Sequence, residues 1–410
     1  MVLPDIAVSA NSDERKNVSD EIKEALRHST LAYVQNGMTG CIDLCRTDEW
    51  DLARSICEMQ DAASRVARSS GKLFKVKFDA SRNERIIGRT KLGQTILQLL
   101  KRYTGGIRQV FPQHTLNLYT ELFLKAAETR GLDRVRWGFE TMLVDTAADN
   151  LVKRLNEFVD DIRAQAGNGK FRVAASKFTR LANKNCLSLR KYFCAQFEAQ
   201  KRLHVLRLDF GYMKETYWPF SLGEGRAYDE VKGHREQLIR FVRKKLPLGC
   251  VTGFAWKMEH SRIRDWNIHV LIFLTCDGDR ISEMLGEQWN TWITKGTGLY
   301  SDCSRSPCSY KKFGTGVIDA DDDVAQDGLR VAAIYLTKTD CQIQLSVPGK
   351  DYVFRKGNMP KPKHASAQNR KIPDPRLDNE EGLTERKRLA SRPRMPAAAK
   401  KGDGFGAAAF

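Results

Sequence analysis

The feature that most constrains the fold is a stretch between residues 254 and 274, in which apolar and polar side chains alternate on both sides of a short polar segment. The segment 261–265 has a length that is typical of a β-hairpin connection. A turn centred on residue 263 predicts three cross-strand pairs, which are Glu259 with Asn267, Met258 with Ile268, and Lys257 with His269. Because alternate residues of a strand share a face, and paired residues share it too, this register determines the chemistry of both faces.

The two faces of this hairpin differ in polarity. One face carries apolar side chains, namely Trp256, Met258, Trp266, Ile268 and Val270. The other face carries four polar groups, namely Lys257, Glu259, Asn267 and His269. The preceding strand divides in the same way, with Leu206, Leu208 and Phe210 on the core side and Arg207 and Asp209 on the polar side. The pattern therefore predicts a sheet with one core face, covered by helices, and one polar face.

The polar face has the donor types of a divalent-cation site. A carboxylate, an amide oxygen and an imidazole suit Mg²⁺ or Mn²⁺ better than a closed zinc site. We therefore expect Glu259, Asn267 and His269 to be metal ligands. Such an ion would polarise a phosphodiester and stabilise charge on its oxygens. The alternative that the pattern leaves open is a set of side chains that only form hydrogen bonds on an open sheet face.

A later helix adds a candidate nucleophile. Residues 327–339 have a helical pattern, and Tyr335 and Lys338 share a face because they are three residues apart. A tyrosine becomes a nucleophile when its proton is removed or its oxyanion is stabilised, and a neighbouring ammonium can supply that stabilisation. Because they follow the hairpin in the order that a nuclease needs, Tyr335 and Lys338 are candidate catalytic residues. The alternative is a lysine that extends past a partly buried ring to reach solvent.

Apolar periodicity predicts an α+β fold. Helices are expected over residues 48–69, 91–103, 115–130, 148–164, 228–245, 282–294 and 327–339, and strands over 204–212, 250–260 and 266–275. From residue 203 onward this order favours an antiparallel sheet with helices packed on one face. Four segments follow: a helical N-terminal domain of unknown role (1–165), a basic helical connector (166–202), the sheet domain (203–355) and a flexible basic tail (356–410).

The charge balance indicates a polyanionic partner. The chain has 68 Lys and Arg against 50 Asp and Glu, a net charge of +18. Neutralising phosphates releases condensed counterions, which favours nucleic acid as the partner. We expect no membrane partner, because no basic amphipathic helix stands beside an apolar anchor. Near the polar face, the cations expected to bind DNA are Arg207, Lys257, Arg262 and Arg264.

The expected compartment is the cytoplasm of the host cell. The N-terminus has no basic start followed by a long apolar run, so it does not resemble a secretory signal. The longest aliphatic and aromatic run, 270–274, is too short to cross a bilayer. The ten cysteines include no CxxC pair, so we expect reduced thiols and no zinc site.

These segments together resemble a known group of proteins. The hairpin and the Tyr335 helix are similar to the HUH endonucleases, which include rolling-circle replication initiators and relaxases. A closer resemblance is to the YagK/YfjJ-type family, associated with inovirus replication proteins and bacterial prophages. Its matching segments occur in order over roughly 200–350: 256–260, 266–274, 285–289 with 293–303, and 335–340.

The resemblance implies a fold, a reaction and a partner. The fold is an RRM-like antiparallel sheet, with Glu259 and His269 as metal ligands. Tyr335 would become linked to a 5′-phosphate, and Lys338 would position or neutralise that phosphate. The implied partner is single-stranded or hairpin origin DNA in a bacterial host, with a helicase or single-strand-binding protein of the host as a further candidate partner. Asn267 departs from the family pattern, which usually has a histidine there, so metal affinity or cleavage itself is in question.

We therefore expect a rolling-circle replication initiator of a filamentous phage or related mobile element, which nicks and rejoins origin DNA. The alternative is a catalytically degenerate DNA-binding protein of a prophage, motivated by Asn267. A third interpretation, a protein–protein adaptor, predicts that the chain has no salt-dependent affinity for DNA.

Overall fold

The computed structural model describes residues 12–30, 32–35, 42–79, 84–102, 106–135, 137, 145–213, 226–262, 264–304, 314–349 and 351–360. The chain divides into two units, residues 1–361 and residues 362–410. From residue 361 onward the predicted basic tail lies outside the described residues. All elements below belong to the first unit.

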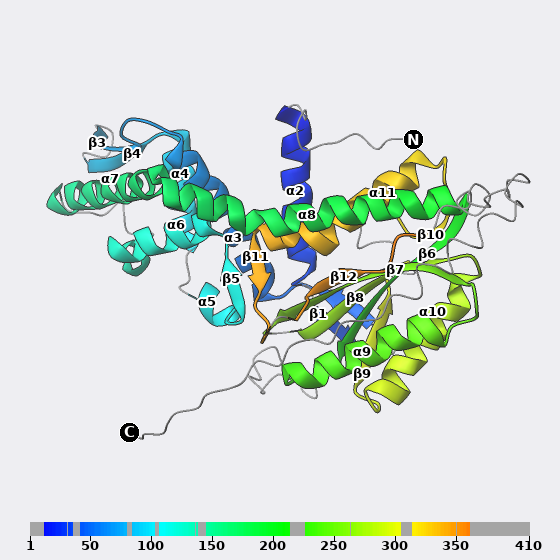
Figure 1. The fold of residues 1–410 in the computed structure, drawn as a ribbon. Coiled ribbons are helices and arrows are strands. Elements are labelled where there is room, and N and C mark those ends of the chain that lie inside the picture. The colour runs from blue at the N-terminus through cyan, green and yellow to red at the C-terminus, as the bar shows by residue number, and fades with distance from the viewer. Residues whose placement is uncertain are drawn as a thin grey trace, which may run out of the picture. The chain divides into compact units, whose positions relative to one another are not determined.

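A six-stranded antiparallel sheet forms the centre of the predicted α+β domain (Figure 1). The path of strands is β10-β6-β8-β7-β12, and β9 also pairs with β6. The strands are β6 (Arg202–Tyr212), β7 (Val251–Ser261), β8 (Asp265–Leu274), β9 (Gly298–Asp302), β10 (Gly316–Asp319) and β12 (Phe354–Lys356). The antiparallel sheet is confirmed, and the short strands β9, β10 and β12 lie outside the predicted strand ranges.

The register of the β7–β8 hairpin is the predicted one. The structure pairs Glu259 with Asn267, Met258 with Ile268, and Lys257 with His269. Strand β6 lies on the other side of β8 and pairs Asp209 with His269. Two cross-strand pairs thus place three polar side chains, those of Asp209, His269 and Lys257, in one row across three adjacent strands.

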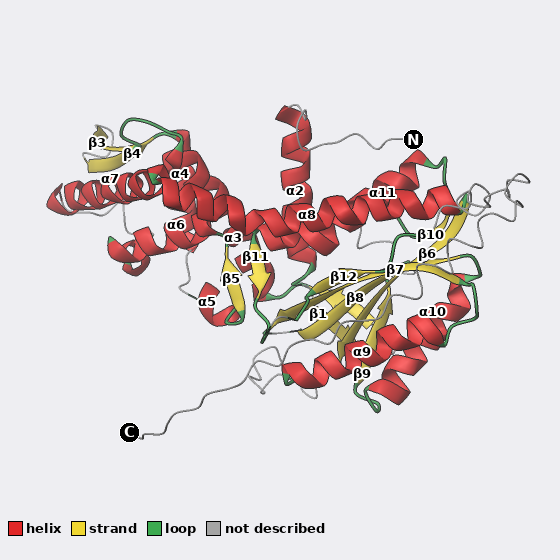
Figure 2. Cartoon of the chain, in the orientation of Figure 1, coloured by secondary structure: helices red, strands yellow, loops and turns green. Residues whose placement is uncertain are grey.

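The apolar face packs as expected. Helices α9 (Tyr228–Lys244) and α10 (Gly278–Glu287) cover it, and α10 continues as the π-helical turn η2 (Gln288–Ile293) (Figures 1 and 2). Val231, Leu238 and Val242 recur at helical spacing on α9 and are buried against the sheet. All five predicted core residues of the hairpin belong to this cluster: Trp256, Met258, Trp266, Ile268 and Val270.

The prediction that helices lie on one face only is wrong. The long helix α8 (Gly169–Ala199) and helix α11 (Asp323–Lys338) cover the second face (Figure 1). Helices cover this face because it also carries apolar side chains, beyond the four polar groups. Val205, Ala255, Leu271 and Phe273 form a second core there with side chains of α8 and α11. Every residue of β8 is therefore buried.

The N-terminal region is less uniformly helical than predicted. Its helices are α2 (Ser12–His28), α3 (Asp48–Ala67), α4 (Lys91–Arg102), α5 (Ile107–Val110), α6 (Leu118–Thr129), η1 (Leu132–Arg134) and α7 (Asp145–Gly167). Two short hairpins, β1–β2 (Ala32–Gln35, Ile42–Cys45) and β3–β4 (Phe74–Asp79, Glu84–Arg89), interrupt them. A cluster of apolar side chains from α3, α4, α6 and α7 forms the main core of this region.

Several contacts join the N-terminal region to the sheet domain. Strand β5 (His114–Leu116) pairs with β11 (Ile343–Leu345), which follows the short helix η4 (Thr339–Cys341). This pairing, together with the Asn117 cap, explains why α6 begins later than the predicted 115. Arg330 of α11 forms ion pairs with Glu21 of α2 at 2.6 Å. Regions 1–165 and 203–355 therefore share contacts over a long sequence separation.

The expectation of reduced thiols is wrong for one pair. Cys250 and Cys276 form a disulfide, with Cα atoms 5.5 Å apart. They flank the strand pairing of Val251 with Leu274, so the register of β7 and β8 brings them together. Sequence spacing gave no signal for this contact. Among the described helices, none is long and apolar enough to cross a membrane.

Candidate functional site

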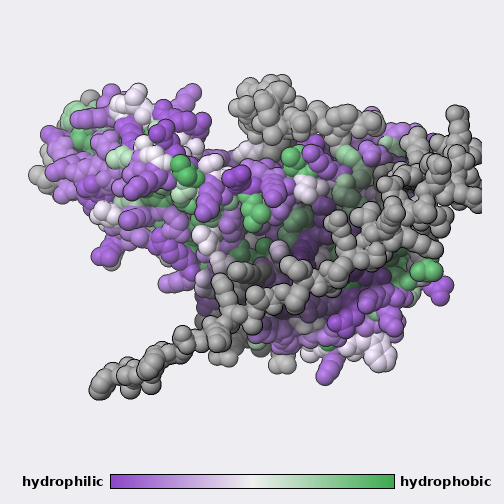
Figure 3. All heavy atoms as spheres, in the orientation of Figure 1, coloured by the Kyte–Doolittle hydropathy of each residue, from purple (hydrophilic) through white to green (hydrophobic). Residues whose placement is uncertain are grey.

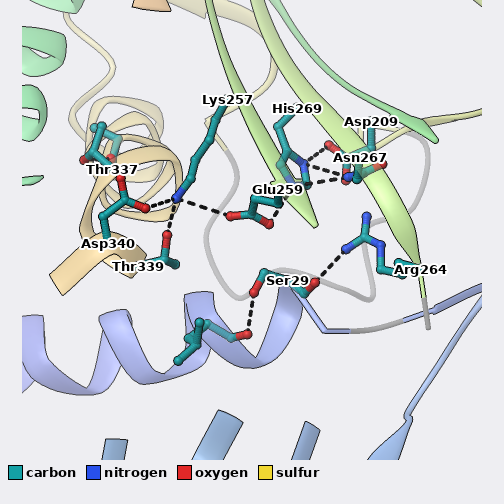
Figure 4. A network of polar contacts seen from close by, with 12 residues as sticks. Ser29, Asp209, Lys257, Glu259, Arg264, Asn267, His269, Thr337, Thr339 and Asp340 are labelled. Atoms are coloured by element: carbon teal, nitrogen blue, oxygen red, sulfur yellow. Dashed lines mark hydrogen bonds and ion pairs between the residues drawn. The ribbon is translucent and has the colours of Figure 1, made fainter. Parts of the chain in front are cut away.

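His269 occupies the middle of a buried polar network on the α8–α11 face (Figure 4). Its Nδ1 lies 2.6 Å from Asp209 Oδ1, and its Nε2 lies 2.9 Å from Glu259 Oε2. Burial alone would lower the pKa of His269, but the two carboxylates outweigh burial and raise that pKa. The protonated form of the side chain is therefore favoured, because it can donate a hydrogen bond to each carboxylate.

The two carboxylates are held ionised by the same contacts. Burial acts to raise the pKa of Glu259, yet His269 and Lys257 lower it to about 2. The pKa of Asp209 is also lowered, because His269 and Arg207 outweigh the effect of burial. Strand parity places Asp209 on the polar side but indicates no role for it. That role needed the strand order, since only the adjacency of β6 and β8 brings Asp209 to His269.

Lys257 extends the network toward η4. Its Nζ lies 2.8 Å from Asp340 Oδ1 and 3.4 Å from Glu259 Oε1, and it also donates to Thr339 Oγ1. Burial would lower the pKa of the Lys257 ammonium, but Asp340 and Glu259 raise it. The Lys257 side chain is 3% exposed. This lysine is consequently an internal counter-ion, and Asp340 and Thr339 are members of the site that sequence reasoning missed.

Asn267 connects the network to a neighbouring arginine. In the amide orientation that satisfies its surroundings, its nitrogen donates to the Phe210 carbonyl at 2.9 Å. Its oxygen then accepts from Arg264 at 2.5 Å and from His269 Nε2 at 3.2 Å. Arg264 also donates to the Ser29 carbonyl at 3.0 Å (Figure 4). Ser29 follows α2, so the N-terminal region contributes a contact to this site.

Tyr335 lies against the same histidine. Its ring centroid is 5.3 Å from that of His269, with the two planes at 86°. The guanidinium carbon of Arg207 is 4.0 Å from the centroid of the Tyr335 ring. Tyr335 is 4% exposed, and burial together with the charge of Glu259 raises its pKa well above the ordinary value. The tyrosine is adjacent to the predicted ligands, but its hydroxyl is fully protonated at neutral pH.

Lys338 does not join Tyr335 in the network. Its Nζ contacts the side-chain oxygen of Asn183 on α8. Residues three apart on a helix differ in direction by about 60°, which suffices here to send one side chain to the sheet and the other to α8. The structure therefore brings Tyr335, Glu259, Asn267 and His269 together and leaves Lys338 outside.

The four cations expected to bind DNA differ in exposure. Arg207, Lys257 and Arg264 are buried, with exposed fractions of 5%, 2% and 9%. Arg262, in the turn between β7 and β8, is exposed. Strand parity gave the face of these side chains but not its accessibility. Lys257 is paired with Glu259 and Asp340, Arg264 donates to Asn267 and Ser29, and Arg207 lies over the Tyr335 ring. Because all three cations are buried, a DNA backbone cannot reach them in this arrangement.

A small cavity lies beside the network. It has a volume of about 30 Å³, and Ser29, His114, Lys257, Glu259 and Asp340 are among its lining residues. A water molecule needs about 10–15 Å³, so the cavity accommodates water or a single ion but not a nucleotide. Segments of the N-terminal region, 26–30 and 111–114, form one side of it.

Glu259, Asn267 and His269 have the donor types of a divalent-cation site, and His269 can be a ligand only after Nε2 has lost the proton that it donates to Glu259. Among the described residues, no group of three or more His, Cys, Asp and Glu is arranged to hold a metal. The predicted set has only two such residues, Glu259 and His269, and its third member is an amide. Asp209 binds Nδ1 of His269, which leaves Nε2 directed at Glu259 and Asn267. A carboxylate that orients a histidine in this way is the usual outer-shell partner of a metal ligand.

Comparison with family models, with curated proteins and with solved structures found no match.

Proposed function

We propose that the chain is a DNA nicking and joining enzyme of the HUH type, with an RRM-like domain, that initiates rolling-circle replication of a phage or related mobile element. The observation that carries the proposal is the contact of the Tyr335 ring with His269, whose Nε2 faces Glu259 and Asn267. A tyrosine beside a carboxylate, an amide and an oriented imidazole supplies a nucleophile together with candidate ligands for a divalent cation.

Each residue has a distinct part in the proposed reaction. Asp209 orients His269 through Nδ1, and Glu259, Asn267 and His269 Nε2 would hold Mg²⁺ or Mn²⁺. The bound ion would supply Lewis-acid polarisation of the scissile phosphate. Arg207 lies over the Tyr335 ring and lowers the pKa of its hydroxyl against the opposing effect of burial. The basic excess of the chain supports DNA as the substrate.

The reaction is a transesterification that conserves atoms and charge. The Tyr335 oxygen bonds to phosphorus, and the bond from phosphorus to the 3′ oxygen breaks. The proton that leaves the tyrosine balances the proton that the departing 3′ oxygen gains. The products are a 5′-phosphotyrosine and a free 3′-hydroxyl, and rejoining is the same step in reverse.

Access to Tyr335 sets a condition on this proposal. The side chain is buried, and the adjoining cavity is too small for a nucleotide. Ser29, just after α2, accepts a hydrogen bond from Arg264. Glu21, within α2, forms an ion pair with Arg330. DNA could reach the tyrosine only after elements that cover this face, among them α8 and the end of α2, move away from it.

The test is a covalent adduct that depends on Tyr335. Purified full-length protein is mixed with Mn²⁺ and labelled single-stranded DNA that tiles the replicon encoding the chain. We expect a denaturation-resistant protein–DNA adduct, which EDTA prevents and Tyr335→Phe abolishes. Tyr300→Phe, in a half-buried tyrosine of β9, is the matched control and should form the adduct normally. A folded wild-type protein that yields neither adduct nor cleavage, while an active HUH enzyme does so in parallel, contradicts the proposal.

A second candidate is a DNA-binding protein that does not cut. The observation in its favour is the burial of Tyr335 together with its raised pKa, since both oppose nucleophilic attack. Under this candidate, Tyr335→Phe leaves replication of the element unchanged in the host. Loss of replication in a folded Tyr335→Phe protein, with normal replication in Tyr300→Phe, favours the enzyme.

A further inference from the structure

A large groove lies on the opposite face of the sheet from Tyr335, between α9 and β12. Its volume is about 780 Å³. One wall is a face of α9, and the other is the segment 351–358, which includes β12. Trp256 lines the groove and belongs to the α9–α10 core, whereas its neighbour Lys257 points to the buried network. The groove therefore shares no side chain with the proposed catalytic site.

The groove is strongly basic. Seven of its lining residues are cations and two are acids, Glu236 and Asp351. Asp351 is already paired, at 3.3 Å from Lys232 and 3.4 Å from Arg235. Arg240, Arg243 and Lys244 are exposed on the groove side of α9. These three form no ion pair within the described part of the chain, so their charge is available to a ligand.

Aromatic rings lie among these cations. Tyr352 is 52% exposed, and the guanidinium carbon of Arg355 is 4.0 Å from its ring centroid. Trp256 lies deeper, with Arg235 4.7 Å from its ring centroid, and half-buried Phe254 also lines the groove. Cations that follow a phosphate backbone, combined with a ring on which a base can stack, are the two components of single-strand binding sites.

We propose that this α9–β12 groove binds single-stranded DNA. Arg240, Arg243 and Lys244 contact successive phosphates, and Tyr352 stacks on an unpaired base. A duplex keeps its bases stacked on one another, so an exposed ring in a groove favours a single strand. A membrane surface would be met by a flat or convex apolar face, whereas this site is hollow and the side chains seen over α9 are largely hydrophilic (Figure 3).

The inference does not depend on cleavage. If the chain nicks DNA, the groove would hold the nucleotides that flank the reacting bond. If it does not, the groove would hold the entire stretch of DNA that the protein binds. The two proposals fail separately. Absence of the Tyr335-dependent adduct in a protein that binds single strands through the groove contradicts the proposed function alone, and unchanged binding in the groove variant contradicts this inference alone.

The test measures binding of a fluorescent 12-nucleotide oligo(dT) to the full chain by anisotropy, across a salt series. The variant Arg240→Gln/Arg243→Gln/Lys244→Gln is compared with Arg172→Gln/Lys177→Gln/Arg180→Gln, which removes the same charge from exposed positions of α8. We expect at least about a tenfold loss in the groove variant only. The slope of log K against log salt should fall by about 2, which is about 0.7 for each of three phosphates. Equal losses in both variants, or none in the groove variant, overturn the inference.

Tyr352 supplies a readout that is independent of charge. Tyr352→Ala should weaken binding about tenfold with the salt slope unchanged, because stacking releases no counterions. Tyr352→Phe retains the ring and should bind normally. Unchanged affinity in Tyr352→Ala overturns the inference. Tighter binding of a 12-base-pair duplex, or of phosphatidylglycerol vesicles, than of oligo(dT) also overturns the inference.

Discussion

The two faces of the sheet differ in whether their charged side chains are buried or exposed. On the α8–α11 face, His269, Asp209, Glu259 and Lys257 are buried and satisfy one another. On the α9 face, at the β12 edge, Arg240 and its neighbours remain in solvent. A buried ion requires an internal partner, because desolvation is otherwise too costly, whereas an exposed cation is free to contact a ligand. Polar side chains on a sheet face therefore do not by themselves indicate a binding surface.

Under the two proposals, the faces have different tasks. The buried network has the donors and the tyrosine for chemistry, but it is closed to a nucleotide. The groove has charge, an exposed ring and room for a strand, but no reactive group beside a candidate metal site. The predictions below compare the effect of a substitution on one face with that on the other.

The largest expected effect follows removal of the central histidine. His269→Ala leaves Asp209 and Glu259 buried without their shared counter-ion, which should lower the free energy of unfolding by about 3–5 kcal/mol. Arg240→Gln in the exposed groove should change it by no more than about 0.5 kcal/mol. Urea denaturation followed by circular dichroism measures both. Similar losses of unfolding free energy in the two variants would contradict this difference between the buried network and the groove.

The next effect is on pH dependence. Because the pKa of Glu259 is lowered to about 2 from 4.5, the carboxylate stabilises the fold above pH 4.5. That contribution is lost as the pH falls from 4.5 through 2, and it amounts to at most about 3 kcal/mol. Glu259→Gln should reduce the difference in unfolding free energy between pH 5 and pH 2 by up to this amount. The groove variant Arg240→Gln/Arg243→Gln/Lys244→Gln should keep the wild-type pH profile, and a change in it would contradict the assignment.

The smallest effect concerns Lys338. Because its ammonium contacts Asn183 at an exposed position, Lys338→Ala should change the unfolding free energy by no more than about 0.5 kcal/mol. Adduct formation should continue in this variant. A loss of adduct comparable to that in Tyr335→Phe would return Lys338 to the reacting site and show that the helix rearranges when DNA binds.

Local patterns predicted much of the sheet and its helices. The register of Glu259 with Asn267, the core face around Trp256, and the helices α9 and α11 follow from periodicity, since side-chain direction is set by backbone geometry within each element. The hairpins of the N-terminal region and β12 were missed because these strands are short. Their pairing with distant or flanking segments decides their structure.

The sequence by itself determined which side chains share a face, because alternation along a strand is a local property. It placed Glu259, Asn267 and His269 together, and it put Tyr335 on a helix. Only the tertiary structure decided that this face is closed, because α8 and α2 come from distant parts of the chain. It also decided that Asp209 is the partner of His269 and that the accessible cations line α9 instead. Burial depends on long-range packing, and burial determines whether a charge supports the fold or is available to a ligand.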